Sequence, residues 1–267
     1  MSTAMQERTT TLAPIEYRLE GVSHSFPGAE TAAIQNVDLT IRRGSFTALI
    51  GPSGCGKSTL LNMFAGLLTP SQGSVRFRGE SLTGPAPQVG VMFQKPALLP
   101  WRTTLENILL PIEVAEGKAA ARQKVDAAME LIETVGLGGF AHAHPWQLSG
   151  GMAQRAAICR MLITEPEILL LDEPFGALDE LTRERMDAEI QRIALERDAT
   201  VILVTHSIPE SIFLADRVLA MAARPGRVNQ IIDVDLPRPR TVDSVADPRY
   251  VQYLKDVRTA LDRGHHD

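Results

Sequence analysis

Residues 51–58 read Gly-Pro-Ser-Gly-Cys-Gly-Lys-Ser, and these residue types at this spacing suit phosphate binding. They match G-x-x-x-x-G-K-[ST], a loop whose backbone N–H groups surround phosphate oxygens. Lys57 can reach the β- and γ-phosphates, and the Ser58 hydroxyl can bind Mg²⁺. The motif predicts binding of a nucleoside triphosphate, but it does not say what the energy is used for.

Three further stretches end in side chains that could act on a triphosphate. Asp172 and Glu173 follow the apolar run Ile168–Leu171. We expect Asp172 to hold Mg²⁺, as the acid after an apolar strand does in P-loop enzymes, and Glu173 to polarise the attacking water. Adjacent strand residues point to opposite sides, so the two acids should have different roles.

Gln94 and His206 also follow short apolar runs, residues 89–93 and 201–205. At the end of a strand, the Gln94 amide can touch both Mg²⁺ and the attacking water, and His206 can hydrogen-bond a γ-phosphate. The sequence therefore predicts strands whose carboxyl ends gather these side chains beside the P-loop.

A second anion-binding segment is Leu148-Ser149-Gly150-Gly151-Met152-Ala153-Gln154-Arg155. Its serine and two glycines lead directly into a predicted helix, which gives a helix N-terminus with a hydroxyl and no obstructing side chains. One P-loop and a separate anion nest indicate a composite site, and the two halves need not meet within one molecule.

The elements that must position these groups can be read from hydrophobic periodicity. Residues 46–50 predict a buried strand before the P-loop, and residues 59–65 predict a helix after it. Residues 17–22 and 37–41 predict antiparallel strands, residues 74–79 a further strand, and residues 218–221 and 228–232 strands that close the sheet. We therefore expect an α/β fold: a P-loop core with a mostly parallel sheet and an N-terminal antiparallel β subdomain.

Helical signals dominate residues 95–155, which predict a helical subdomain inserted in the core. Thr103 and Glu106 form a capping-box pattern, and Gly136 follows an amphipathic stretch as a helix stop. Asp247 and Pro248 predict the N-cap and first residue of a last helix that ends at Gly264. The expected organisation is a disordered tail at residues 1–14, one nucleotide-binding domain at residues 15–235, and a short extension at residues 236–267.

Two features have two interpretations each, and a pair of histidines is unlike a metal site. Phe26 could stack on adenine or be a partly buried aromatic at a strand end. The apolar loop 96–101 could pack under a neighbouring helix or receive a partner protein. His142 and His144 lack the carboxylate or cysteine company of a metal site.

Composition narrows the class of protein. The 267 residues are 44% hydrophobic and 22% charged, as in ordinary globular proteins. A net charge of −5 disfavours a nucleic-acid machine, which usually needs a basic face. The two cysteines, Cys55 and Cys159, suggest neither a disulfide nor a metal pair, and no signal peptide or membrane-spanning run is expected.

The order of these motifs resembles the ATP-binding subunit of ABC transporters over roughly residues 17–235. The resemblance rests on the P-loop, Gln94, the Ser149 segment, Asp172 with Glu173, the loop Gly176-Ala177-Leu178-Asp179, and His206. Residues 93–101 and 223–227 are similar to the importers of the nitrate, sulfonate, taurine and hydroxymethylpyrimidine group. Ala153 and Ser207 depart from the common pattern, at positions that touch none of the expected chemistry.

The resemblance implies an ATPase that works as a head-to-tail dimer, converting ATP to ADP and phosphate. Glu173, His206, Gln94 and Lys57 would be catalytic, and Ser58, Gln94 and Asp172 would hold Mg²⁺. The implied nucleotide contacts are Phe26, Gly51, Ser53, Gly54, Cys55, Gly56, Lys57, Ser58 and Thr59 from one copy and Ser149, Gly150, Gly151 and Asp179 from the signature side.

The implied partners are a second copy of the subunit, transmembrane permease subunits docked near residues 94–101 and, indirectly, a substrate-binding protein, at the cytoplasmic face of the inner membrane. Nitrate, alkanesulfonate, taurine and pyrimidine precursors all stay open as cargo. The alternatives are a soluble ABC-type ATPase of DNA repair or translation and the ATPase of an exporter. Lys57 and Ser149 are too close in sequence for the long coiled coil of the repair proteins.

Overall fold

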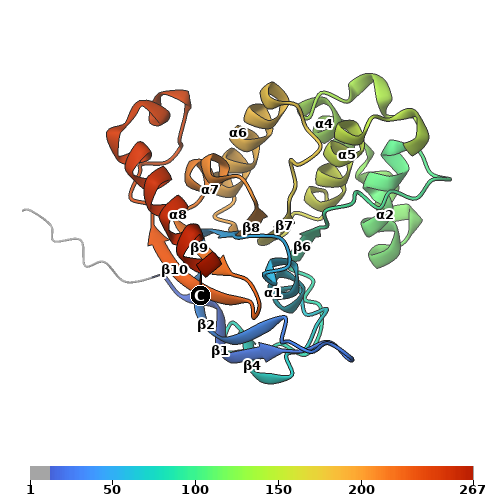
Figure 1. Cartoon of the computed structure of the whole chain (residues 1–267). Helices are drawn as coiled ribbons and strands as arrows, with labels where there is room; N and C mark the ends of the chain where they lie inside the picture. The colour runs from blue at the N-terminus through green and yellow to red at the C-terminus, as the bar shows by residue number, and fades with distance from the viewer. Residues whose placement is uncertain (1–12, 267) are drawn as a thin grey trace, which may run out of the picture.

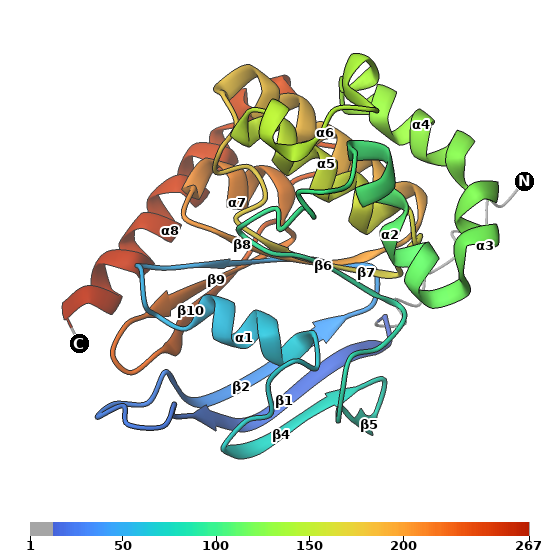
Figure 2. The same cartoon turned by 90° about the vertical axis from the view of Figure 1, so that its right-hand side faces the viewer.

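The computed structural model describes residues 13–266, and most of the predicted N-terminal tail, residues 1–12, lies outside them. The chain forms three layers (Figure 2): a small antiparallel sheet, a central sheet with helix α1 (Lys57–Phe64) between the two, and helices over the opposite face of the central sheet. This is the expected α/β architecture.

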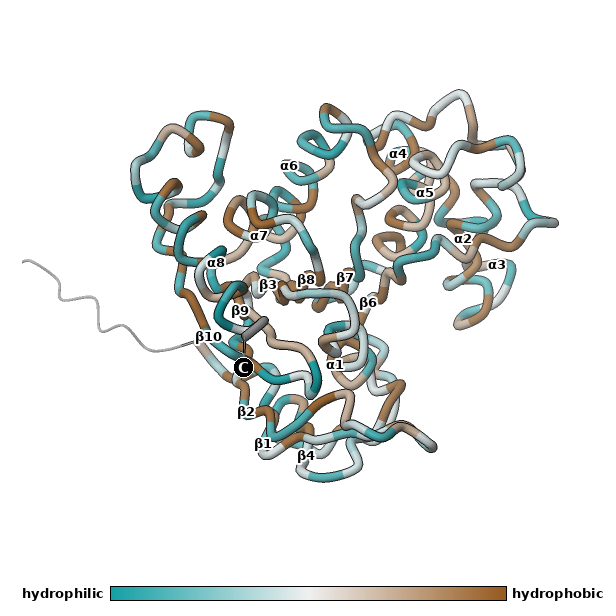
Figure 3. Tube along the Cα trace, in the orientation of Figure 1, coloured by the Kyte–Doolittle hydropathy of each residue, from teal (hydrophilic) through white to brown (hydrophobic). Residues whose placement is uncertain are grey.

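The central sheet has the strand order β10-β9-β3-β8-β7-β6. Neighbouring strands from β6 to β9 run parallel, and β10 pairs with β9 as an antiparallel edge. Strands β3, β7 and β8 are buried at every residue, because helices or the second sheet cover both faces, and they form the hydrophobic centre of Figure 3. The strands are β3 (Phe46–Ile50), β6 (Val89–Met92), β7 (Ile168–Asp172), β8 (Thr200–Thr205), β9 (Arg217–Ala222) and β10 (Arg227–Asp233).

The antiparallel sheet has the order β2-β1-β4-β5 and covers α1 from below in Figure 2. Its inward face packs on that helix: the rings of Tyr17 and Phe64 meet edge to face with centroids 5.1 Å apart. Burial raises the pKa of the Tyr17 phenol well above its usual value. The strands are β1 (Ile15–His24), β2 (Ile34–Arg42), β4 (Gln72–Phe77) and β5 (Glu80–Ser81).

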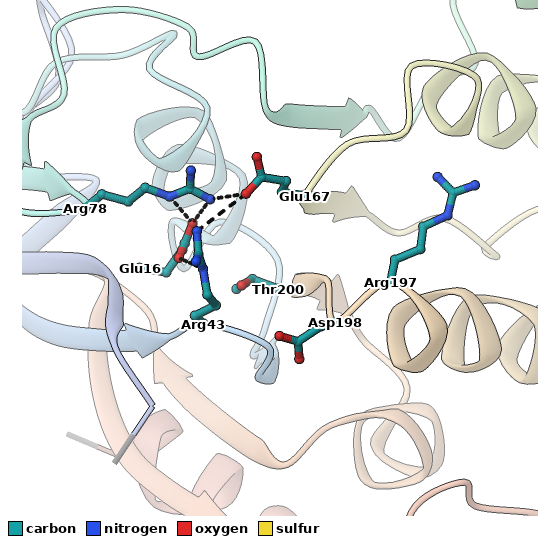
Figure 4. Close-up of a pocket in the computed structure, with 7 residues that line it drawn as sticks. All are labelled: Glu16, Arg43, Arg78, Glu167, Arg197, Asp198 and Thr200. Atoms are coloured by element: carbon teal, nitrogen blue, oxygen red, sulfur yellow. Dashed lines mark hydrogen bonds and ion pairs between the residues drawn. The ribbon is translucent and has the colours of Figure 1, made fainter. Parts of the chain in front are cut away.

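An ion-pair cluster joins the two sheets at the end of the molecule where the parallel strands begin (Figure 4). Glu16 of β1 is only 2% exposed and accepts hydrogen bonds from Arg43 at 3.2 Å and Arg78 at 2.7 Å. Both arginines also contact Glu167, just before β7. The cluster therefore couples the N-terminal subdomain to the strand that ends in Asp172.

Helices α2 to α5 form the lobe predicted for residues 95–155. Thr103 and Glu106 make the predicted capping box at the start of α2. The last of these helices, α5, continues beyond residue 155 to Leu162. Near its end, Arg160 donates to the carbonyl oxygens of Pro96 and Ala97. The helices and 3₁₀ turns are α2 (Thr104–Glu116), α3 (Lys118–Gln123), α4 (Val125–Thr134), η1 (Gly138–Phe140), η2 (Pro145–Gln147) and α5 (Gly150–Leu162).

The remaining helices are α6 (Glu180–Glu196), α7 (Ile208–Leu214) and α8 (Pro248–His266), with a 3₁₀ turn η3 (Val242–Ala246) before α8. The predicted end of α8 at Gly264 is wrong, because the helix runs on to His266. Gly264 serves close packing, since a Cβ there would lie 3.2 Å from the Cβ of Ala222. Within residues 13–266, no helix is both long and apolar enough to span a bilayer.

Candidate functional site

The P-loop connects β3 to α1 as predicted, and close packing explains Gly51 and Gly56, whereas Gly54 has φ +78° with open space around it. Gly56 has φ +88°, and a Cβ there would lie 2.2 Å from the Ile34 side chain. No side chain caps the start of α1, and its first turn holds no acid, so its N–H groups suit an anion. The buried Lys57 ammonium donates to the carbonyl oxygens of Gly51 at 2.6 Å and Pro52 at 3.0 Å, which holds it inside the loop.

Ser58 and Asp172 meet across α1 and β7. The Asp172 carboxylate is buried, at 9% exposed, near the Ser58 hydroxyl. Burial raises the pKa of Asp172, and the nearby Ser58 hydroxyl and the charge of Lys57 oppose that shift. The residues 13–266 hold no cluster of three or more His, Cys, Asp or Glu side chains suited to a metal. A hydroxyl and a carboxylate side by side fit Mg²⁺, which takes few protein oxygens and completes its shell with phosphates and water.

Glu173 lies between Gln94 and His206. The Gln94 side-chain amide donates to one Glu173 carboxylate oxygen at 3.0 Å, and His206 Nδ1 lies 3.6 Å from the other. Glu173 has φ +47°, so it has left the strand, and the predicted alternation of sides does not describe it. The backbone turns at Glu173, so its side chain is directed away from that of Asp172. The side-chain amide of Gln154, on α5, stabilises this turn by donating to the Glu173 carbonyl oxygen at 3.1 Å.

The Ser149 segment opens α5 as predicted. Ser149 is the N-cap, and its hydroxyl accepts a hydrogen bond from Met152 N at 3.2 Å. Both Ser149 and Gly150 are exposed, whereas a Cβ on Gly151 would lie 3.0 Å from Leu178. The structure therefore brings this segment against the loop 176–179 of the same chain. Asp179 at the end of that loop caps α6, and the N–H of Thr182 lowers its pKa.

The aromatic candidates lie on the surface. Phe26 is 46% exposed and meets the His24 ring edge to face, so one face can still take a base. In the loop 96–101, Leu98 packs on the core, as the first interpretation predicts, while Trp101 is 70% exposed. His144 stacks on Trp146, with ring centroids 4.3 Å apart.

Sequence reasoning missed two buried acids behind His206. Glu210 on α7 and Asp187 on α6 are each 7% exposed, and burial raises the pKa of both, that of Asp187 to about 8. The side chain of Ser207 caps α7 by accepting from Glu210 N at 3.3 Å, and the pattern Ser-x-x-Glu could have revealed this cap. Nothing local in the sequence marks Asp187 as buried.

Comparison with known sequences agrees with this geometry. The family model described as ABC transporter matches residues 34–176. The aliphatic sulfonates import ATP-binding protein SsuB of Bacillus licheniformis is 49% identical over 79% of this chain and 81% of its own length. The bicarbonate transport ATP-binding protein CmpD of Synechocystis sp. is 40% identical over 94% of this chain and 89% of its own. The uncharacterized ABC transporter ATP-binding protein MJ0412 of Methanocaldococcus jannaschii is 42% identical over 88% of this chain and 86% of its own length.

Solved structures show the same fold. The dimeric structure of MJ0796, a bacterial ABC transporter cassette, has a TM-score of 0.75 and 31% identity, and the match covers 83% of this chain and all of that one. A post-hydrolysis state of the same cassette, bound to ADP and Pi, has a TM-score of 0.73 and 30% identity. The P-loop, the Glu173 cluster and these matches together show that the chain belongs to the ABC transporter family, as one of its ATPase subunits.

Proposed function

We propose that the protein is the ATP-hydrolysing subunit of a bacterial-type importer for small solutes of the sulfonate, bicarbonate or nitrate kind. The relatives named for sulfonate and bicarbonate import support this class of cargo. The observation that carries the hydrolytic role is the Glu173 carboxylate, held between Gln94 and His206 at the carboxyl edge of the central sheet. Taurine and pyrimidine precursors are the other cargoes that the importer group handles.

In the proposed mechanism, Lys57 and the P-loop N–H groups hold the β- and γ-phosphates. Ser58, Asp172 and Gln94 would hold Mg²⁺, which would neutralise phosphate charge. Glu173 orients the attacking water and accepts its proton, while His206 contacts the γ-phosphate. Positioning and charge stabilisation account for most of the rate in such a transfer.

The Ser149 nest acts on the nucleotide of a second copy. In this chain its glycines pack against the loop 176–179, and Ser149 faces solvent. A serine hydroxyl and a helix N-terminus that face outward suit the γ-phosphate of a neighbour. The dimeric cassette structure supports a two-fold assembly of this kind, in which ATP closes the dimer and hydrolysis reopens it.

The membrane partner docks on the surface formed by Phe93, Gln94 and Trp101. Phe93 is 44% and Trp101 70% exposed, which is unusual for large apolar side chains. Gln94 joins this surface to Glu173 through its hydrogen bond. A permease segment seated there would sense the state of the ATP site from the cytoplasmic face of the inner membrane.

The test is a pull-down of tagged Glu173→Gln protein from native membranes in detergent with ATP, with mass spectrometry of its partners. We expect a polytopic membrane protein in near-equal amount, and Trp101→Ala to reduce its recovery. The matched control is Trp146→Ala, which removes another exposed tryptophan, 68% exposed, from outside this surface. Recovery with ribosomes, DNA or soluble partners alone would replace the importer with a soluble ABC-type ATPase.

A further inference from the structure

Helix α7 begins just after His206 and packs against both α6 and α8 (Figure 1). His206 lies between this helix and Thr205, the last residue of β8. Its side chain is 69% exposed, and its Nδ1 lies 3.6 Å from Glu173, which is longer than a hydrogen bond. The position of the ring therefore depends on the backbone on either side of it. The central sheet fixes one side, and α7 fixes the other.

The end of α7 is held by an arginine from residues 236–266, which we call the C-terminal segment. Arg240 is only 2% exposed. Its guanidinium donates to the carbonyl oxygens of Ile212 at 2.7 Å, Phe213 at 3.4 Å and Ala215 at 2.7 Å. These carbonyls belong to the last turn of α7 and to its C-cap, where a helix leaves carbonyl groups unpaired. A cation there also balances the negative end of the helix dipole.

Arg240 is itself anchored to the rest of the fold. Its guanidinium also donates to the carbonyl oxygens of Val234 at 3.3 Å and Leu236 at 3.1 Å, just after β10. Its backbone N–H and carbonyl both pair with the side-chain amide of Gln191 on α6. The planar guanidinium presents its donors in a fixed fork, so its partners are held in a fixed arrangement. Arg240 therefore fastens the end of α7 to α6 and to the chain that leaves β10.

The beginning of α7 is held by the last helix. The Tyr250 hydroxyl, on α8, donates to the carbonyl oxygen of Pro209, the second residue of α7, at 3.0 Å. Beside this bond the packing is open. Residues 206–209 and the α8 side chains of Val251 and Leu254 line a cleft of about 580 Å³. Because a cleft gives few apolar contacts, the hydrogen bond from Tyr250 contributes much of what holds the start of α7 to α8.

We propose that Tyr250 and Arg240 are positioning residues for ATP hydrolysis, which hold α7 at its two ends and thereby keep His206 beside Glu173. This inference rests on the γ-phosphate contact that the proposed function gives to His206. Displacement of a catalytic group by about 1 Å can slow a reaction about 100-fold, so a small shift of α7 is enough to matter. The C-terminal segment would then contribute to hydrolysis without touching the nucleotide.

The first test removes the Tyr250 hydroxyl. Tyr250→Phe should lower kcat about two- to tenfold, the factor that one net hydrogen bond represents. The KM for ATP should stay unchanged, because the P-loop is untouched. The matched control is Tyr253→Phe on the same helix, whose hydroxyl accepts from the backbone N–H of Asp235 at 2.9 Å and does not contact α7. Turnover in the control should equal that of the wild type, and melting curves of both variants measure stability separately.

The second test asks whether this effect passes through His206. Tyr250→Phe is combined with His206→Ala, and the rates of the four proteins are compared in single-turnover hydrolysis of ATP. We expect Tyr250→Phe to cause no further loss once the imidazole has been removed. A purely structural role would instead lower the rate by the same factor in both backgrounds, because the effects of independent sites add in free energy.

Arg240→Lys applies the same measurement to the other end of α7. Lysine keeps the positive charge but lacks the fork of donors that reaches several carbonyl oxygens together. We expect kcat to fall with the KM for ATP unchanged, and again only while His206 is present. Because exchange of a buried arginine can prevent folding, the combination of Tyr250→Phe with His206→Ala is the deciding measurement.

The outcomes separate this inference from the function beneath it. Wild-type turnover in Tyr250→Phe, or an equal loss with and without His206, overturns the positioning role and leaves the ATPase function standing. An equal loss in Tyr253→Phe also overturns it, because that hydroxyl does not contact α7. Near-normal turnover in His206→Ala would remove the proposed γ-phosphate contact itself and so overturn both.

Discussion

The Gln94 side-chain amide donates a hydrogen bond to the Glu173 carboxylate at 3.0 Å, and the two residues lie just after the ends of neighbouring strands, β6 and β7. Gln94 stands beside the exposed Phe93, and Glu173 lies 3.6 Å from His206. One hydrogen bond therefore joins the surface proposed for the membrane partner to the group proposed to orient the attacking water. Movement of the loop after β6 would change the orientation of that carboxylate.

Replacing Glu173 with Gln should lower ATP turnover by roughly 10²–10⁴, the usual loss when a general base is removed. The amide keeps the shape of the side chain, so ATP affinity should stay near that of the wild type. Steady-state hydrolysis measures the turnover, and equilibrium nucleotide binding measures the ATP affinity. Glu80→Gln, an exposed acid on β5, is the control. Near-normal turnover in the Glu173 variant would remove this residue from the role.

Replacing Ser149 with Arg should abolish turnover without weakening ATP binding to the monomer, because the bulk blocks a nest that serves another copy. Loss of the N-cap hydroxyl costs helices about 0.5–2 kcal/mol, so thermal unfolding should be compared as well. Ser149→Gly is the companion variant, since it removes the hydroxyl but leaves the N–H groups open. Full activity in the arginine variant would contradict the composite site.

Replacing Glu16 with Gln should lower the free energy of unfolding by about 1.5–3 kcal/mol, the range for hydrogen bonds to charged groups. Glu16 is 2% exposed, but its partners Arg43 and Arg78 have side chains 43% and 31% exposed and can recover some hydration. Urea unfolding measures the change. Glu20→Gln is a control on the same strand, because that side chain is 51% exposed and its ion pairs are 3.8 Å or longer. Equal effects at both positions would contradict a structural role for the cluster.

Asp187 makes the stability of the fold depend on pH. Its carboxyl is buried, one of its oxygens has no hydrogen-bond partner within the described chain, and its pKa rises from 3.8 to about 8. The folded state thus keeps a proton that the unfolded state releases near pH 3.8. The stabilising contribution of this proton is complete below pH 3.8, and it is lost as the pH rises to about 8.

Asp187→Asn should remove this dependence. The difference in melting temperature, variant minus wild type, should grow from pH 5 to pH 8 and then level off. The corresponding difference in the free energy of unfolding should change by at most about 1.4 kcal/mol per pH unit. Asp126→Asn, at an exposed position on α4, is the control. A difference curve that stays flat across this interval would mean that Asp187 is ionised in the folded protein.

Much of the fold could be predicted because its strands and caps are local patterns. The runs before Gly51 and Asp172 are apolar apart from Thr47, as expected of strands with both faces covered. Thr103 and Glu106 specify a helix start by hydrogen bonds within four residues. The prediction that α8 ends at Gly264 is wrong, because this glycine lies inside the helix, where it packs closely against Ala222 of β9.

The sequence by itself determined the chemistry of the candidate site, because each group follows a motif that local backbone geometry controls. The tertiary structure decided which groups meet. It placed Gln94 and His206 on the two sides of Glu173, packed Gly151 on the loop 176–179, and joined Glu16 to Arg43 and Arg78. These contacts join segments far apart in the chain. They depend on the order of strands in the sheet and on the packing of helices, which no local pattern encodes.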